Sequence, residues 1–156
     1  MRTSTGAVGI VIHKGNILLI YREKFGKKYF MFPGGGIEDG ENAEQAVVRE
    51  LAEETSIIIR PIRQVYHIKY DDGTDRLYFL CEYVSGTPKL QENTNEYEQI
   101  VKGEQYYEPK WLPISDLNST LVYPLQVRDW VCKDIEDDFD VPIRDLYIDR
   151  TKERQL

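Results

Sequence analysis

The sequence is poor in cysteine, in long apolar runs and in positive charge. Cys81 and Cys132 are its only cysteines and form no CxxC pair, which excludes a disulfide-stapled fold and favours free thiols in a reducing compartment. The longest early apolar run, 7–12, stops at His13 and Lys14. That run is too short to span a membrane or to form a signal-peptide core of about 7–15 residues. We therefore expect a cytoplasmic protein with no membrane partner.

The deficit of positive charge bears on the partners of the protein. Lys and Arg number 20 against 27 Asp and Glu, so the formal net charge is −7. This balance disfavours a nucleic-acid groove or an anionic membrane surface as the main partner. An anionic substrate would have to arrive with its metal ion or meet a local basic patch. The length of 156 residues predicts one domain over 1–156, with a polar C-terminal tail from about residue 144.

The most informative stretch runs from Gly35 to Ile57. It starts in a glycine-rich turn, 33–36, and continues with apolar residues every three or four positions, which is the period of an α-helix. Asn42 is a candidate N-cap, and Gln45 three residues later would complete a capping box.

Three glutamates, Glu50, Glu53 and Glu54, project toward one side of this helix because they are three and four residues apart. Like charges at that spacing oppose helix formation by roughly 0.2–0.5 kcal/mol per pair. A bound cation would reverse the penalty, and Mg²⁺ prefers oxygen ligands from carboxylates and substrate phosphates. The competing interpretation is a solvated acidic helix face, which is what most charge runs are.

The residues around the glutamates resemble the signature of the Nudix hydrolases, G-x5-E-x7-R-E-U-x-E-E-x-G-U, in which U is a bulky aliphatic residue. The pattern is met in register by Gly35, Glu41, Arg49, Glu50, Leu51, Glu53, Glu54 and Ile57. The one departure is Ser56, where the family has glycine. A residue that ends a helix in the left-handed region is usually glycine, and serine there would cost on the order of 1 kcal/mol or force a different helix ending.

The resemblance implies a fold and a set of metal ligands. The fold would be the α/β/α sandwich of the family, a mixed β-sheet flanked by helices. Glu50, Glu53 and Glu54 would bind Mg²⁺, or Mn²⁺ in its place, with Glu41 as a weaker ligand and a main-chain carbonyl near Gly34 as a further oxygen donor.

The resemblance also implies the catalytic groups. Arg49 would hold the carboxylates in position, as a guanidinium fork does well. The general base would be Glu53 or a glutamate on the loop before the last strand, where Glu92, Glu96, Glu98 and Glu104 stand. Among those four we favour Glu104, which lies seven residues before Trp111. All four could equally be surface charges.

The rest of the chain predicts strands, loops and a closing helix. A β-hairpin is predicted for residues 6–13 and 17–21, followed by a basic loop over 22–28. Further strands are predicted for 57–70, 76–84 and 110–113, with a long acidic loop over 89–108. The spacing of apolar residues predicts an amphipathic helix over 121–135. Candidate substrate contacts are Arg22 and Lys24 in the basic loop and the aromatic side chains Tyr29 and Phe32, for which solvated-loop and core-packing roles are the alternatives.

Three functions follow from these observations. The first is Mg²⁺-dependent hydrolysis of a phosphoanhydride in a nucleoside diphosphate linked to another moiety, such as a nucleoside triphosphate, a sugar nucleotide or a dinucleoside polyphosphate. The partner would be a small nucleotide and not a nucleic acid, and the family often forms homodimers. The second is a nucleotide-sensing module on the same fold without turnover. The third is an acidic interaction protein whose helix matches the signature by accident. Since no signature glutamate is missing, the enzyme is favoured.

Overall fold

The computed structural model describes residues 5–91 and 105–150. Nine strands lie in this part of the chain: β1 (Thr5–His13), β2 (Asn16–Lys24), β3 (Lys27–Met31), β4 (Gly34–Gly36), β5 (Ile58–Tyr70), β6 (Asp75–Ser85), β7 (Tyr106–Pro113), β8 (Val122–Tyr123) and β9 (Arg144–Ile148). The helical elements are α1 (Ala43–Thr55), α3 (Ile114–Leu117), α4 (Leu125–Asp134) and the 3₁₀ turn η1 (Ile135–Asp137). In the described residues no helix has both the length and the apolar character needed to cross a membrane.

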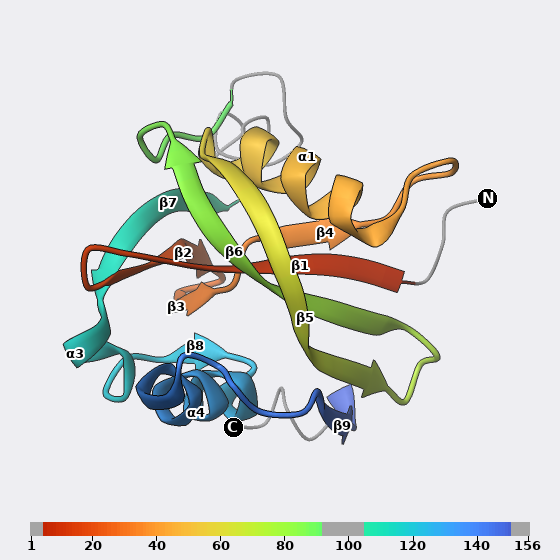
Figure 1. The fold of residues 1–156 in the computed structure, drawn as a ribbon. Helices are drawn as coiled ribbons and strands as arrows, with labels where there is room; N and C mark the ends of the chain where they lie inside the picture. The colour runs from red at the N-terminus through yellow and green to blue at the C-terminus, as the bar shows by residue number, and fades with distance from the viewer. Residues whose placement is uncertain (1–4, 92–104, 151–156) are drawn as a thin grey trace.

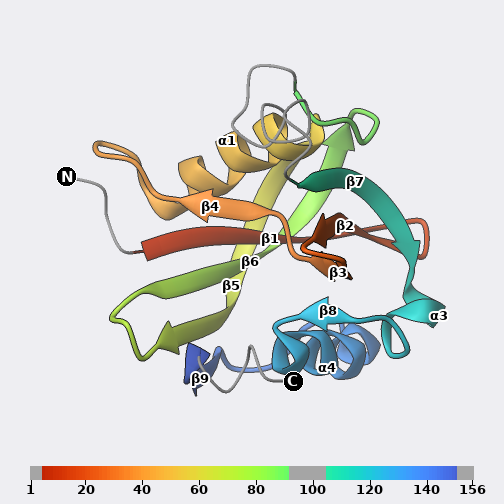
Figure 2. The ribbon, with the colours of Figure 1, turned by 180° about the vertical axis from the view of Figure 1, so that it is seen from behind.

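The strands form one mixed sheet in the order β8-β3-β2-β1-β6-β5-β9, with β4 paired to β1 and β7 paired to β2. The pairs β1–β6, β3–β8 and β5–β9 are parallel, and the other pairs are antiparallel. Helix α1 lies on one side of the sheet and α4 on the other (Figures 1 and 2). This confirms the predicted mixed sheet flanked by helices.

Each helix covers its own apolar cluster. Val47 and Leu51 of α1 pack with Ala7, Val11 and Leu18 of the sheet. On the opposite side, residues of α4 pack against the alternate positions of the same strands, namely Val127 and Val131 with Ile10, Ile17 and Leu19. Successive side chains of a strand point to opposite faces, so β1 and β2 contribute to both clusters. The strands are buried on both faces where the helices cover them.

The signature helix begins as its sequence predicts. The Asn42 side chain accepts a hydrogen bond from the Gln45 N–H, and the Gln45 side chain accepts one from the Asn42 N–H, which completes the capping box. Ser56 ends the helix in the left-handed region, with φ 61° and ψ 17°. Its Oγ donates a hydrogen bond of 2.5 Å to the Lys89 carbonyl, a contact that glycine could not make.

The basic segment 22–28 is a hairpin and not the loop expected from its polarity. β2 continues to Lys24 and β3 starts at Lys27, and the two are joined by Phe25 and Gly26 with φ of 51° and 77°. Two residues with positive φ form the tight turn whose twist matches the flanking strands. The charged side chains are therefore held in strand register.

Four further segments differ from expectation because their partners are distant in sequence. Gly34–Gly36 is a short strand on β1 and not only a turn. β7 starts at Tyr106, four residues earlier than predicted, because it pairs with β2 along its full length. Arg144–Ile148 is not a loose polar tail, since it pairs with β5 and forms the edge strand β9. The closing helix starts at Leu125, and the residues before it form β8.

Candidate active site on the signature helix

The centre of the candidate site is the Arg49 guanidinium on α1. Its Nε and Nη2 atoms each donate a hydrogen bond of 2.8 Å to a different oxygen of Glu41, which makes a bidentate pair. Nη1 donates to Glu50 at 3.0 Å and to Glu53 at 3.4 Å, and Nη2 also donates to the Gly36 carbonyl at 3.0 Å. Arg49 therefore ties the glycine turn, the start of the helix and two signature carboxylates together, as the sequence predicts.

The two carboxylates on either side of Arg49 have opposite pKa shifts. Hydrogen bonds from Arg49 lower the pKa of Glu41 to about 2. Burial raises the pKa of Glu50, and this effect outweighs the hydrogen bond from Arg49 that favours its ionised form. Glu41 is thus a permanent anion that orients Arg49, whereas Glu50 is a desolvated carboxyl group that a nearby cation would stabilise.

Gly35 explains the burial of Glu50. A Cβ atom at position 35 would lie less than 3.0 Å from the carboxyl carbon and both oxygens of Glu50. The carboxyl group therefore rests directly on the main chain of β4, where no other residue type leaves room. The glycine of the signature is required here by this close approach and not by an unusual φ angle.

The donor set has the chemistry of a Mg²⁺ site. Glu50, Glu53 and Glu54 lie on one helix, and all of them offer oxygen, which hard divalent cations prefer. In the described residues, no three His, Cys, Asp or Glu side chains stand close enough together to hold a metal ion as they are. Arg49 takes up oxygens of Glu50 and Glu53, and the Glu53 side chain is about half exposed, at 48 %. The carboxylate oxygens are therefore of the type that Mg²⁺ binds, but the ion would have to compete with Arg49 for the oxygens of Glu50 and Glu53.

The candidate base glutamates divide between two parts of the chain. Glu53 lies at the exposed edge of the cluster, 3.4 Å from Arg49 Nη1. Glu92, Glu96, Glu98 and Glu104 fall outside the described residues. Gly34 lies in β4 opposite Val8, next to the glycine on which Glu50 rests.

The structure brings Arg22 and Tyr29 together and separates Phe32 from them. Arg22 and Tyr29 are directly opposite each other on β2 and β3. Phe32 is 4 % exposed and packs edge to face on Tyr78 in the core, with ring centroids 5.8 Å apart. It therefore has a packing role, and we withdraw it as a substrate contact. Lys24 lies at the end of β2, near the tip of the hairpin.

Two residues contact Arg22, and one contacts Tyr29, that the sequence did not indicate. Arg22 donates hydrogen bonds to Gln105 at 2.5 Å and to the Tyr107 hydroxyl at 2.7 Å. Tyr123 of β8 packs edge to face on Tyr29, with ring centroids 5.4 Å apart. Only strand pairing brings these side chains together, so no local signal could have found them.

The comparisons with known proteins agree with this geometry. The family model described as the NUDIX domain matches residues 3–130. An RNA pyrophosphohydrolase of Mannheimia succiniciproducens is 45 % identical to this chain, over 80 % of the chain and 73 % of that protein. The RNA pyrophosphohydrolase of Actinobacillus pleuropneumoniae serotype 7 is 40 % identical over 40 % of the chain, a match that spans 31 % of that protein.

Solved structures share the fold. A NUDIX hydrolase from Nitrosomonas europaea superimposes with a TM-score of 0.70 at 13 % identity, over 93 % of this chain and 78 % of that one. A MutT structure from work on the Aliivibrio salmonicida and Vibrio cholerae proteins gives a TM-score of 0.57 at 26 % identity, over 84 % and 93 % of the two chains.

Proposed function

Because the chain belongs to the NUDIX domain family, we propose that this Nudix hydrolase cleaves a phosphoanhydride bond of a nucleoside diphosphate linked to another moiety, with Mg²⁺ as its cofactor. The observation that carries the proposal is the carboxylate cluster around Arg49, which rests on the glycine strand β4. The similar proteins named RNA pyrophosphohydrolase and MutT support a nucleotide 5′-phosphate chain as the substrate, on a free nucleotide or on the end of an RNA.

The metal would be held by Glu50, Glu53 and Glu54, with a main-chain oxygen near Gly34. When bound, it supplies charge neutralisation on the phosphate oxygens and lowers the pKa of the attacking water. Mn²⁺ would serve the same donors. The same ion would relieve the desolvation of the Glu50 carboxylate.

The chain's own residues have three tasks in this proposal. Arg49, anchored by Glu41, keeps the carboxylates aimed at one place. Glu53 takes the proton of the attacking water. Of the three carboxylates that lie under 3.5 Å from Arg49, its side chain is the most exposed to solvent. Glu104 is the alternative base from the segment outside the described residues. Arg22, Lys24 and Tyr29 bind the nucleotide beyond the phosphates.

The enzyme would act in the cytoplasm. Cys81 and Cys132 are both free thiols in the structure, as expected of a reducing compartment. Burial raises the pKa of the Cys81 thiol to about 12, so this thiol is not a nucleophile.

Release of phosphate or pyrophosphate from a substrate panel tests the proposal. The panel holds canonical and oxidised nucleoside triphosphates, ADP-ribose, sugar nucleotides, dinucleoside polyphosphates and a 5′-triphosphate RNA oligomer, each with and without Mg²⁺. We expect Mg²⁺-dependent turnover that falls at least about 100-fold in Glu53→Gln and Glu54→Gln, because these changes remove metal ligands or the base. Glu44→Gln is the matched control, since Glu44 is exposed in the first turn of α1 and outside the cluster.

Two outcomes would contradict the proposal. If the wild type binds Mg²⁺ and a nucleotide but turns over no substrate, the chain is a sensing module. If all three variants lose activity equally, the cluster is not the catalytic centre.

A further inference from the structure

Two of the three candidate metal ligands lie in the last turn of α1. The helix ends at Thr55, so Glu53 and Glu54 are among its final three residues. The last turn of a helix frays readily, because its final four carbonyl groups have no partner further along the helix. Contacts from outside α1 therefore bear on how firmly these two glutamates are held.

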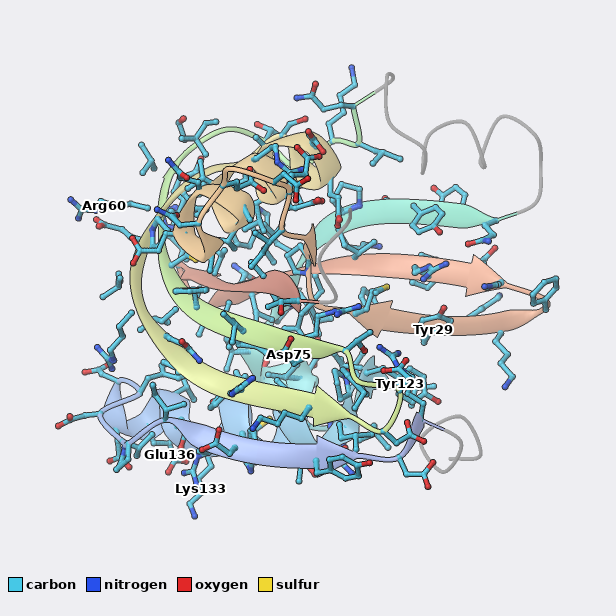
Figure 3. All side chains as sticks on the ribbon, turned by 90° about the vertical axis from the view of Figure 1, so that its right-hand side faces the viewer. Tyr29, Arg60, Asp75, Tyr123, Lys133 and Glu136 are labelled. Atoms are coloured by element: carbon cyan, nitrogen blue, oxygen red, sulfur yellow. The ribbon has the colours of Figure 1, made fainter. Side chains whose placement is uncertain are left out.

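The segment 86–91, which we call the capping segment, lies against this end of the helix. The chain leaves β6 and passes beside the end of α1, as Figure 3 shows. Gly86 has a φ of 106°, and a Cβ atom there would lie 2.4 Å from the main-chain oxygen of Ser56. The Gly86 carbonyl accepts a hydrogen bond of 2.7 Å from the Tyr83 hydroxyl. The capping segment thus starts in direct contact with the main chain that ends α1.

The capping segment supplies hydrogen-bond donors to the helix end. The Lys89 N–H donates to the Thr55 carbonyl at 2.8 Å, and the Gln91 N–H donates to the Glu53 carbonyl at 3.3 Å. The side-chain amide of Gln91 donates to the Ala52 carbonyl at 3.1 Å. Three of the last four carbonyls of α1 are therefore bound from this one segment, and one of them belongs to a candidate metal ligand.

Ser56 completes the contact in the opposite direction. Its N–H donates to the Ala52 carbonyl at 3.0 Å within the helix end, and its Oγ donates to the Lys89 carbonyl at 2.5 Å. Lys89 is thus bound to the helix end through both its N–H and its carbonyl. The second bond needs a side-chain donor, which the glycine of the family signature does not have.

The conformation of Ser56 has a cost that this bond offsets. Its φ of 61° lies in the left-handed region, which is less favourable for serine than for glycine. Glycine would end the helix without strain but would leave the Lys89 carbonyl without this donor. Serine at this position therefore exchanges an unstrained helix end for a bond to the capping segment.

We propose that Ser56 is a positioning residue for the metal site: its hydroxyl fixes the last turn of α1 to the capping segment and so keeps Glu53 and Glu54 in the arrangement that binds Mg²⁺. The inference rests on the proposed function, because it takes these glutamates as metal ligands. Ser56 acts through the helix end and is not itself a ligand.

Mg²⁺ binding to the full chain without substrate, followed by isothermal titration calorimetry, tests this role. Ser56→Gly keeps the left-handed helix end and removes the hydroxyl. It should raise the dissociation constant for Mg²⁺ about fivefold, because losing one hydrogen bond lowers the fraction of protein with an ordered last turn by about that factor. The melting temperature of the metal-free protein should stay within about 2 °C of the wild type or rise, since glycine relieves the strain.

Ser56→Ala separates the hydroxyl from the backbone conformation. It should raise the dissociation constant by the same factor of about five, because the same bond is lost. Its melting temperature should fall by about 2–4 °C, because alanine keeps the strain without the bond. Affinity for Mg²⁺ would then follow the hydroxyl and not the stability, which a merely stabilising hydrogen bond would not produce.

Amide hydrogen exchange measures the contact itself. In both Ser56 variants the amide protons of Lys89 and Gln91, which donate to the helix end, should exchange about fivefold faster than in the wild type. Unchanged exchange rates at these two amides would overturn the inference, because the hydroxyl would then not hold the capping segment.

Ser119→Gly is the matched control. The Ser119 hydroxyl also donates to a main-chain carbonyl near a helix end, that of Asp116 in α3, at 3.2 Å, but α3 carries none of the signature glutamates. Its dissociation constant for Mg²⁺ should stay within about 1.5-fold of the wild type.

The outcomes separate this inference from the proposed function. Equal Mg²⁺ affinities in the wild type and Ser56→Gly would overturn the inference and leave the proposed function intact. Equal weakening in Ser56→Gly and Ser119→Gly would overturn it too, because the effect would not be specific to α1. A wild type that binds no Mg²⁺ would contradict the proposed function and, with it, this role of Ser56.

Discussion

At the scale of single residues, the site depends on how closely Glu50 approaches the main chain. The bidentate pair between Arg49 and Glu41 sets the position of the guanidinium, and Gly35 leaves the space in which the Glu50 carboxyl group lies. The permanent charge of Glu41 follows from its lowered pKa. The Arg49 guanidinium and the main chain at Gly35 thus fix the position of the Glu50 carboxyl group, which would bind the metal.

Gly35→Ala should inactivate the enzyme without unfolding it. The added methyl group would displace the Glu50 carboxyl group, and a misplacement of about 1 Å can cost about 100-fold in rate. The clash is with the end of a side chain and not with the main chain, so we expect the free energy of unfolding to change by less than about 1 kcal/mol. Turnover of the best substrate and urea unfolding measure the two effects.

The double variant Gly35→Ala/Glu50→Asp is the control for this prediction. The shorter aspartate leaves room for the methyl group, so part of the lost activity should return. A Gly35→Ala protein as active as the wild type, or one that loses several kcal/mol of stability, would show that Glu50 is not positioned by this contact.

At the scale of elements, β9 is held to α4 and β5 by a buried carboxylate. Asp134 at the end of α4 is 1 % exposed and accepts hydrogen bonds of 2.6 Å and 2.9 Å from Arg144 of β9. The Tyr66 hydroxyl of β5 donates to the same carboxylate at 2.8 Å. Burial opposes ionisation of Asp134, but the hydrogen bonds from Arg144 and Tyr66 outweigh it and lower its pKa. One side chain therefore joins three elements.

Asp134→Asn should destabilise the protein by roughly 2–3 kcal/mol at pH 7, because hydrogen bonds to a charged group are lost. A lowered pKa in the folded state means that this stabilisation is complete above the unfolded value of about 3.8 and disappears as pH falls through the folded value. The difference in stability between wild type and variant should stay constant from pH 5 to 8 and close below about pH 4. Urea unfolding at a series of pH values measures it.

Asp137→Asn is the comparison for this series, since Asp137 is exposed in the neighbouring 3₁₀ turn. It should change stability by less than about 0.5 kcal/mol at every pH. A difference for Asp134→Asn that does not shrink as the pH is lowered from about 4 toward about 2 would mean that the carboxylate charge does not hold β9.

At the scale of the whole molecule, the chain combines two kinds of charge on one side of the sheet. The signature carboxylates lie on α1, and Arg22, Lys24 and Lys27 lie on the β2–β3 hairpin. The net charge of −7 hides this separation, because charges of opposite sign on different surfaces cancel in the sum. Composition therefore indicated that an anionic ligand needs its metal ion or a local basic patch, but it could not locate such a patch.

Mg²⁺ should stabilise the protein against unfolding. We also propose that the chain is a single domain, so it should unfold in one cooperative transition. At about 100 times its dissociation constant the ion adds about 2.7 kcal/mol, which corresponds to roughly 5–10 °C in a chain of this size. Calorimetry with Mg²⁺ and after chelation measures the shift. Glu53→Gln/Glu54→Gln should lose it and Glu44→Gln should keep it.

Sodium chloride of matched ionic strength separates binding from screening in this experiment. If it raises the melting temperature as much as Mg²⁺ does, the ion only screens the acidic surface and no site exists.

The sequence by itself determined the signature helix and its capping box, because both depend on residues within a few turns of one another, where helix geometry alone sets the distances. The first hairpin, β1–β2, was predictable for the same reason, since its turn residues, Lys14 and Gly15, lie between the strands that it joins. The pairing of Arg49 with the glutamates was expected from the family signature and not from helix geometry, since Glu41 lies before α1.

Only the tertiary structure decided which residues surround Arg22, which face carries the lysines and where the C-terminal segment lies. Arg22 and Tyr107 are 85 residues apart, and β9 reaches β5 from the far end of the chain. Phe32 and Tyr29 have similar side chains, yet Phe32 enters the core and Tyr29 lies beside Arg22 on the neighbouring strand. A strand's side chains alternate, so a shift of one residue in register exchanges the two faces, and register is set by pairing between distant strands.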